Sequence, residues 1–411
     1  MKNNIKKNFV WNTFGSTINS ATSLFFLIIV TRLNGDVDAG IFTFAFSTAC
    51  LLQVLATYFG RSYQVTETSD KYSNYDFIYS RYISCIIMFI CALFFTMVKG
   101  YLLYKTIVIL LLALFKMVEA YSEVIYAIIQ KNDDLYKVGI SLFLKAILGT
   151  ILFLLIDIIS KNIIISILGL IIVNVLLLVF YDIPNSKKYK YEKTKFNFIN
   201  IKLLFKSGFY TFLFTFLTQY IINAPRYAID NNMVDKYQTI FGIIIMPATF
   251  IILCGQFLIH PFLVKLTNCY KEKNIKGFTS LVIKISLSLL LLGLVASILS
   301  YFIGIPFLEI LYGISLTGYT KSLIIIIIGA TLFALSYIIS NALIVMRKTF
   351  IQSIIFIISS VFAYFISKLL VIKYGVEGAS LSYLLTMLLV DILYIISFAI
   401  YINKDLRENK E

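Results

Sequence analysis

Charged side chains inside long apolar stretches are the residues of this sequence most able to do chemistry. Lys116, Glu119 and Glu123 fall in one such stretch at the spacing i, i+3 and i+7. On a helix this spacing places all three on one face, where Lys116 can pair with Glu119. Charges in an apolar environment are costly, so they mark a substrate or ion pathway by default. An internal ion pair that only holds helices together stays open as the alternative.

Three further cations lie in or beside other apolar stretches. Lys145 has no acidic residue three or four positions away, and Arg226 has only Asp230. Cations without a local partner favour a water-filled, anion-binding cavity over a structural ion pair. Arg61 closes the second apolar stretch. It could anchor the helix at the membrane surface or contact an anionic substrate, and we favour the second interpretation.

Carboxylates supply candidates for ion coupling. Asp391 lies in the last apolar stretch, where a structural role and a coupling role are both open. Glu119 and Glu123 are the other two candidates. His260, the only histidine, precedes Pro261, and we expect it at a helix end and not in a proton relay.

No enzyme signature accompanies these charges. The sequence has no G-x-x-x-x-G-K-[ST] phosphate-binding loop, and a single histidine cannot build a histidine-rich metal site. The triplet at 36–38 has the D-x-D form of some metal-dependent sugar-nucleotide enzymes, but a solvated turn is the better interpretation. The five cysteines have no paired spacing and are expected to be reduced, small hydrophobic residues. We therefore expect no enzyme activity, no catalytic residue, no cofactor and no metal.

The elements that position these charges are predicted to be transmembrane helices. The chain has 411 residues, of which 60% are hydrophobic and 14% charged, whereas a soluble domain has about 25% charged residues. Its apolar stretches are continuous, which indicates helices and not the alternating strands of a barrel. The net charge of +15 does not indicate nucleic-acid binding, because lysines and arginines gather in the short connections.

The expected fold class is all-α, with about twelve transmembrane helices. The chain then divides into an N-terminal six-helix half at 1–181, a basic linker at 182–203 and a C-terminal six-helix half at 204–411. The expected spans are 9–31, 40–59, 78–97, 104–129, 138–157, 163–181, 204–223, 238–264, 279–303, 322–346, 350–372 and 378–402.

The basic connections also predict orientation. With the N-terminus in the cytoplasm, most connecting lysines and arginines fall on the cytoplasmic side, which places both termini and the linker there. We expect a multi-pass protein of the bacterial cytoplasmic (inner) membrane. Pro225 and Pro247 allow kinks or broken helices, and simple kinking is the commoner outcome.

Several motifs resemble those of bacterial polysaccharide flippases of the Wzx type. Residues 61–66, R-S-Y-Q-V-T, resemble their R-x-Y-Q-V-T/S signature. Residues 223–230, N-A-P-R-Y-A-I-D, resemble an N-A-P-K/R-Y-A-I-D segment, and 241–247, F-G-I-I-I-M-P, resemble the F-G-x-I-x-M-P that follows it. The segments 119–130, 258–261 and 345–348 also look like that group, so the similarity covers essentially the whole chain.

The resemblance implies membership of the multidrug/oligosaccharidyl-lipid/polysaccharide exporter superfamily. It implies two six-helix bundles around a central cavity that opens alternately to each face. The implied substrate is an undecaprenyl-diphosphate-linked oligosaccharide repeat unit of an O-antigen or capsule. Membrane lipids are expected partners, a polysaccharide polymerase and glycosyltransferases are candidate partners, and no nucleic acid is expected. Lys145 stands where relatives are expected to have arginine, and lysine lacks the fork geometry that suits a diphosphate.

A flippase must carry two phosphates past an apolar barrier while the lipid tail stays in the membrane. A cavity lined by basic side chains would lower that barrier, and the expected substrate-binding residues are Arg61, Lys116, Lys145 and Arg226. The energy source stays open among the membrane potential, an ion gradient and removal of product. The alternative is a drug or metabolite exporter on the same scaffold, although it would favour an apolar or acidic cavity.

Overall fold

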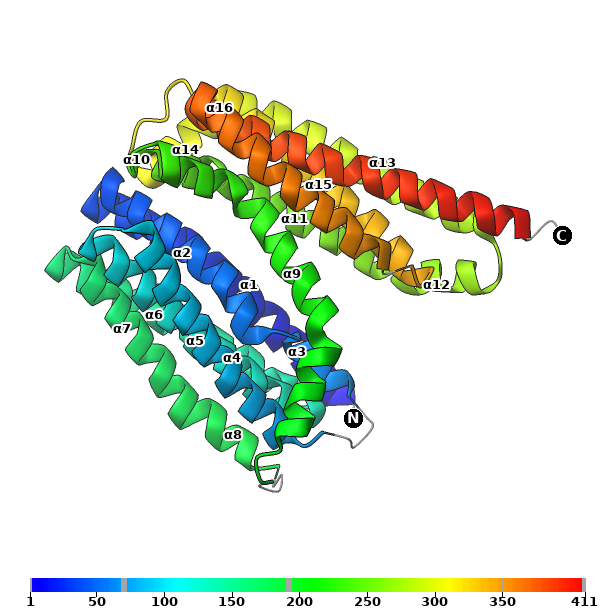
Figure 1. Cartoon of the computed structure of the whole chain (residues 1–411), viewed down its shortest axis with the longest axis horizontal. Helices are drawn as coiled ribbons and strands as arrows, with labels where there is room; N and C mark the ends of the chain where they lie inside the picture. The colour runs from blue at the N-terminus through cyan, green and yellow to red at the C-terminus, as the bar shows by residue number, and fades with distance from the viewer. Residues whose placement is uncertain (1, 68–71, 190–193, 349, 409–411) are drawn as a thin grey trace. The chain divides into compact units, whose positions relative to one another are not determined.

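The computed structural model describes residues 2–67, 72–189, 194–348 and 350–408 (Figure 1). Every regular element in these residues is helical, as expected. The chain forms two compact units, Met1–Phe216 and Leu217–Glu411. The long helix α9 (Phe198–Asn232) begins in unit 1 and ends in unit 2. Each unit is described by itself below.

Unit 1 is a bundle of long apolar helices. Its second span is interrupted between α2 (Asp36–Thr57) and α3 (Gly60–Thr66). A π-helical turn at Leu178–Asp182 joins α7 to α8, so one continuous helix runs past the expected start of the linker at 182. Residues 190–193 of that expected linker lie outside the described residues. The helices of unit 1 before α9 are α1 (Lys2–Asn34), α2 (Asp36–Thr57), α3 (Gly60–Thr66), α4 (Asn74–Lys99), α5 (Leu103–Lys131), α6 (Leu135–Ser160), α7 (Ile163–Leu177) and α8 (Ile183–Lys187).

Unit 2 also consists of helices in the residues that the structure describes. Pro247 stands in the first turn of a new helix, whereas α9 runs through Pro225 without interruption. His260 lies in a short 3₁₀ turn at a helix end, where it was expected. The helices of unit 2 after α9 are α10 (Lys236–Ile244), α11 (Met246–Ile259), α12 (Leu263–Lys271), α13 (Ile275–Leu299), α14 (Ile305–Tyr312), α15 (Thr320–Val345) and α16 (Phe350–Glu408).

Nine helical stretches of the described chain are long and apolar enough to cross a membrane. Helices α5 and α9 are not among the nine, and both carry several charged residues along their length. The last stretch contains a break at Gly375, whose φ of 57° and ψ of −130° suit only glycine. The expected all-α membrane fold is therefore confirmed, while the count of twelve, which includes these three cases, stays a prediction.

A pair of glycines allows close contact between α1 and α6 in unit 1. A Cβ atom on Gly15 of α1 would lie 2.0 Å from the carbonyl oxygen of Gly139 on α6. Small residues at such crossings let helix backbones touch, which is how helices associate in a membrane where apolar burial alone gives little. The α1–α6 contact brings the polar residues of α1 next to Lys145 on α6.

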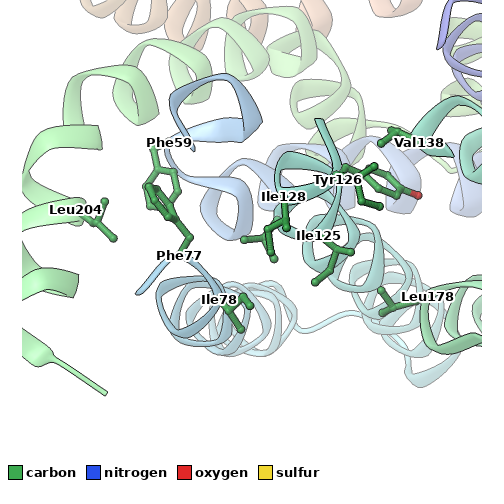
Figure 2. Packing of buried hydrophobic residues seen from close by; sticks show 11 residues of the cluster. Phe59, Phe77, Ile78, Ile125, Tyr126, Ile128, Val138, Leu178 and Leu204 are labelled. Carbon is green, nitrogen blue, oxygen red and sulfur yellow. The ribbon is translucent and has the colours of Figure 1, made fainter. Parts of the chain in front are cut away.

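A buried apolar cluster holds the interrupted end of the second span. Figure 2 shows Phe59, between α2 and α3, packed on Phe77 of α4, with ring centroids 5.6 Å apart. Leu204 of α9 belongs to the same cluster, as does Leu178 of the α7–α8 helix. Because Phe59 packs in this cluster, it positions the short helix α3 that follows it. The Arg61 side chain lies on α3.

Candidate functional site

Unit 1 contains a cavity of about 300 Å³ inside the bundle, among α1, α2, α5 and α6. Four of the sequence-predicted residues line it: Lys116, Glu119, Glu123 and Lys145. The remaining lining residues are mostly polar, which is unusual at this depth in apolar helices: Asn19, Ser20, Thr22, Ser23, Phe46, Gln53, Ser122, Tyr126 and Leu142.

Lys116 forms the pair predicted from its spacing. Its Nζ lies 2.7 Å from Glu119 Oε2, and Gln53 Nε2 donates to the same oxygen at 3.4 Å. The ammonium also lies over the ring of Phe46, 4.6 Å from its centroid. The lysine side chain is 10% exposed and the glutamate 21%, so the pair faces the cavity and is partly solvated.

Lys145 has the partner that its neighbouring sequence lacks. Its Nζ donates to Asp182 Oδ2 at 2.7 Å, to Ser122 Oγ at 2.7 Å and to the Tyr126 hydroxyl at 2.9 Å. An ammonium group has three N–H donors, so all of them are used. The expectation of an unpaired cation in water is therefore corrected: Lys145 lines the cavity, but it belongs to a buried ion pair.

Arg61 forms a looser contact on α3. Its Nε lies 3.6 Å from Glu123 Oε2, and the two side chains are 26% and 30% exposed. The helix break before it positions α3, because Tyr58 and Gly60 have φ values of 48° and 72°. Arg61 Nη1 is buried without a hydrogen-bond partner in the described residues. Glu123 therefore joins Arg61 to the cavity.

Arg81 on α4 is a buried cation that the sequence analysis missed. It is 1% exposed, and its Nη1 donates to the carbonyl oxygen of Ala56, at the interrupted end of α2. Ser84 Oγ donates to the same oxygen at 2.6 Å. The Nε and Nη2 atoms of Arg81 have no hydrogen-bond partner among the described residues. An arginine inside the predicted span 78–97 was the available signal, because charges inside spans are rare.

The other two predicted residues belong to unit 2. Arg226 on α9 is 7% exposed, and its guanidinium carbon lies 5.7 Å from the centroid of the Phe241 ring. Asp391 on α16 is 3% exposed, and neither carboxylate oxygen has a hydrogen-bond partner in the part of the chain described. The structure thus brings Arg61, Lys116 and Lys145 together in unit 1. Arg226 and Asp391 belong to unit 2.

A polar cluster at the start of α6 also involves the segment after α8. The Tyr189 hydroxyl donates to Asp134 Oδ2 at 2.5 Å, and Lys137 Nζ donates to the Tyr189 hydroxyl at 3.0 Å and pairs with Asp134. Partial burial raises the pKa of Asp134, but the hydrogen bonds from Lys137 and Tyr189 outweigh it, so the pKa is lowered overall. This cluster fastens the connecting segment to the bundle that holds the cavity.

Comparison with known proteins agrees with this architecture. No protein-family model matches the chain. A capsular polysaccharide biosynthesis protein, CapF of Staphylococcus aureus, is 28% identical over 393 residues, which cover 92% of this chain and 94% of CapF.

Solved transporter structures match nearly the whole chain. The lipid II flippase MurJ in an inward closed conformation has a TM-score of 0.69 at 17% identity, covering 95% of this chain and 87% of MurJ. An inward-facing multidrug resistance MATE transporter of the MOP superfamily has a TM-score of 0.67 at 11% identity, covering 96% and 99%. The chain has the fold of the MOP-superfamily transporters.

The shared fold agrees with the architecture that the flippase resemblance implies, and the similarity to CapF agrees with the resemblance to polysaccharide flippases. These relatives are transporters or take part in polysaccharide biosynthesis. The comparisons do not test individual site residues, so the roles of Arg61, Lys116, Lys145 and Arg226 in substrate binding stay predictions. The same holds for Glu119, Glu123 and Asp391 in coupling.

Proposed function

We propose that this protein is a flippase that moves undecaprenyl-diphosphate-linked oligosaccharide repeat units from the cytoplasmic to the external face of the bacterial cytoplasmic membrane. The observation that carries the proposal is the polar cavity of unit 1, which presents basic side chains within apolar helices. The MOP fold and the similarity to CapF support a transport role in capsule or O-antigen synthesis. Both termini lie in the cytoplasm in this proposal.

The cavity suits the charged part of such a substrate. A volume of about 300 Å³ lies at the small end of ligand pockets. It therefore accommodates a diphosphate and the adjoining sugar better than a whole oligosaccharide. Aromatic side chains such as Phe46 and Tyr126 line the same space and can pack against a sugar ring.

Binding is proposed to occur by exchange of anions. In the structure the two lining lysines, and Arg61 beside the cavity, each have a carboxylate partner, so the diphosphate must displace a carboxylate from a lysine or arginine. The Arg61–Glu123 contact is the longest and most exposed of the three, and Lys116–Glu119 is next. We therefore assign the phosphate contacts to Arg61 and Lys116. Lys145 has no free donor, so its proposed role is to hold the cavity wall in place.

The displaced carboxylates connect binding to energy supply. Glu119 and Glu123 need a new partner when the diphosphate takes their cations, and a proton or a metal cation from an ion gradient would fill that role. Asp391 is the remaining coupling candidate, in unit 2. Arg226 is proposed to contact the phosphates in another state of the alternating-access cycle.

A drug or metabolite exporter remains the second candidate, because MATE transporters share the fold and the cavity contains as many acidic as basic lining residues. An organic cation would pair with Glu119 and Glu123, whereas a diphosphate would pair with Arg61 and Lys116. The two functions therefore depend on opposite members of the same ion pairs.

The test compares Arg61→Gln and Lys116→Gln with Lys161→Gln, which removes a positive charge from unit 1 outside the cavity. The first two variants should accumulate lipid-linked repeat units on the cytoplasmic face at normal protein levels, and the control should export normally. Lys116→Glu should be worse than Lys116→Gln, because it adds repulsion with the phosphates. Normal polysaccharide export by both cavity variants would contradict the proposal. Loss of organic-cation export on neutralising Glu119 or Glu123 would then favour the exporter.

A further inference from the structure

A second cavity, of about 450 Å³, lies in unit 2 and is lined by residues of α12 and of the C-terminal part of α16, among others. Figure 1 shows α12 and the end of α16 at the same end of unit 2. The second cavity is distinct from the cavity of unit 1, and the proposed transport does not involve it. Its lining residues come from α12, the α12–α13 connection, the end of α15 and the end of α16: Thr267, Tyr270, Lys271, Lys273, Ile275, Val345, Arg347 and Asp405.

The position of this cavity along the helices is well defined. Four membrane-length apolar stretches start or stop at it: Lys236–Lys271, Ile275–Tyr312, Thr320–Val345 and Phe350–Leu406. The ends of such stretches mark the boundary between hydrocarbon and water. The cavity therefore lies at the depth of lipid phosphate groups.

The charge of the cavity favours an anion. Three basic side chains, Lys271, Lys273 and Arg347, line it and are exposed. The single acidic lining residue, Asp405, accepts a hydrogen bond from the Tyr270 hydroxyl at 2.9 Å. In the described chain, Lys271 and the Arg347 guanidinium have no hydrogen-bond or ion-pair partner. An arginine guanidinium can bind two phosphate oxygens at once.

Two of the basic residues at the cavity have a left-handed backbone conformation. Lys273 and Arg347 have φ values of 56° and 61°, the left-handed conformation that commonly ends helices and that favours glycine. Each residue follows a helix end and turns the chain at the cavity.

Apolar side chains lie next to this basic cavity. Val264 on α12 is 72% exposed and Ile344 at the end of α15 is 47% exposed, one turn or less from lining residues on the same helices. Phe350, at the start of α16, is 69% exposed. Free phosphate would not need such a surface, but the acyl chains of a lipid would.

We propose that this cavity binds the phosphate of an anionic phospholipid, with Arg347 and Lys271 as direct ligands and the acyl chains on the adjoining apolar surface. Basic pockets between transmembrane helices at the membrane surface bind anionic head groups in this way. The bound lipid would join the ends of α12, α15 and α16.

The experiment titrates the purified full-length protein with three probes and follows its thermal unfolding: a short-chain phosphatidylglycerol, a short-chain phosphatidylcholine and inorganic phosphate. Phosphatidylglycerol should stabilise the protein at the lowest concentration. Inorganic phosphate acting at the same concentration as phosphatidylglycerol would overturn the lipid assignment and indicate a free-phosphate site. Equal stabilisation by phosphatidylcholine would overturn the role of net charge.

Substitutions inside and outside the cavity test whether phosphatidylglycerol binds there. The double variant Lys271→Gln, Arg347→Gln should weaken phosphatidylglycerol binding about 30-fold, since each basic residue near an anionic lipid contributes a factor of about five. The matched control Lys265→Gln, Lys276→Gln removes two exposed charges from the same region outside the cavity. It should change binding less than about threefold at physiological salt, because neither side chain lines the cavity and salt screens exposed charges. An equal loss in both double variants would overturn the site and indicate general surface attraction.

Discussion

The buried pair of Lys145 and Asp182 allows the structural and ligand-binding roles of a membrane cation to be separated. In the structure the Lys145 side chain is 5% exposed and the Asp182 side chain 0%. Lys145→Met removes the ammonium and leaves the carboxylate buried with no cation. Asp182→Leu leaves the ammonium with only Ser122 and Tyr126. The double variant removes both charges together.

The expected magnitudes differ sharply among these variants. Removing one member of a buried ion pair costs about 3–5 kcal/mol, because the remaining charge is left uncompensated. Replacing both by apolar residues is often close to neutral. For a unit of this size, 1 kcal/mol corresponds to roughly 2–4 °C in melting temperature. Each single variant should therefore melt about 10 °C below the parent protein, and the double variant should recover most of that loss.

Thermal unfolding of the full-length protein in one detergent measures these shifts, and the four proteins form a double-mutant cycle. Lys116→Met is the matched control. It also removes a cavity lysine from an ion pair, but the Glu119 side chain that remains is 21% exposed and still accepts from Gln53, so the loss should be smaller than for Lys145→Met. A Lys145→Met protein that melts like the parent but fails to export would refute the reasoning, since Lys145 would then act on the substrate and not on the fold.

Two further predictions concern the ends of the bundle. Arg81→Met should lower the melting temperature more than Ser84→Ala, because Arg81→Met removes the charged donor to the Ala56 carbonyl oxygen and Ser84→Ala removes only the neutral one. Equal shifts would show that Arg81 does not hold the interrupted helix. Asp134→Asn should destabilise the protein at neutral pH, because the pKa of Asp134 is lowered in the folded protein. The ionised carboxylate therefore stabilises the fold at pH values above its unfolded-state pKa of about 3.9, and this stabilisation is lost as the pH falls through the lower folded-state pKa. The difference in melting temperature between parent and Asp134→Asn should therefore vanish at pH values well below 4, and a difference that persists there would contradict this linkage.

The sequence predicts local features of the cavity well. Helix periodicity alone places Lys116 three residues from Glu119 on one face, and the structure joins them at 2.7 Å. Continuous apolar stretches likewise predict the helices and their approximate ends, because membrane-spanning structure must satisfy its backbone within each helix. Both inferences need only residues a few positions apart.

Contacts between distant segments were not predictable in this way. Asp182 is 37 positions from Lys145, and the expected span ended at 181, so the acidic partner was assigned to a linker. The helix in fact continues through a π-helical turn to Lys187 and keeps Asp182 buried. Arg81 was missed for a related reason, since its partner is a carbonyl oxygen that becomes available only where α2 is interrupted.

In the proposed function, the ion pairs determine the charge of the cavity before substrate binds. A cavity that held Lys116 and Lys145 without counterions, with Arg61 beside it, would place positive charges in a poorly solvated space, at a cost of several kcal/mol. Carboxylates from α5 and the α7–α8 helix remove that cost in the empty state. A diphosphate then gains only the difference between its own contacts and those of the carboxylates it displaces. Weak net binding of this kind suits a transporter, because the substrate must also leave the cavity on the other side of the membrane.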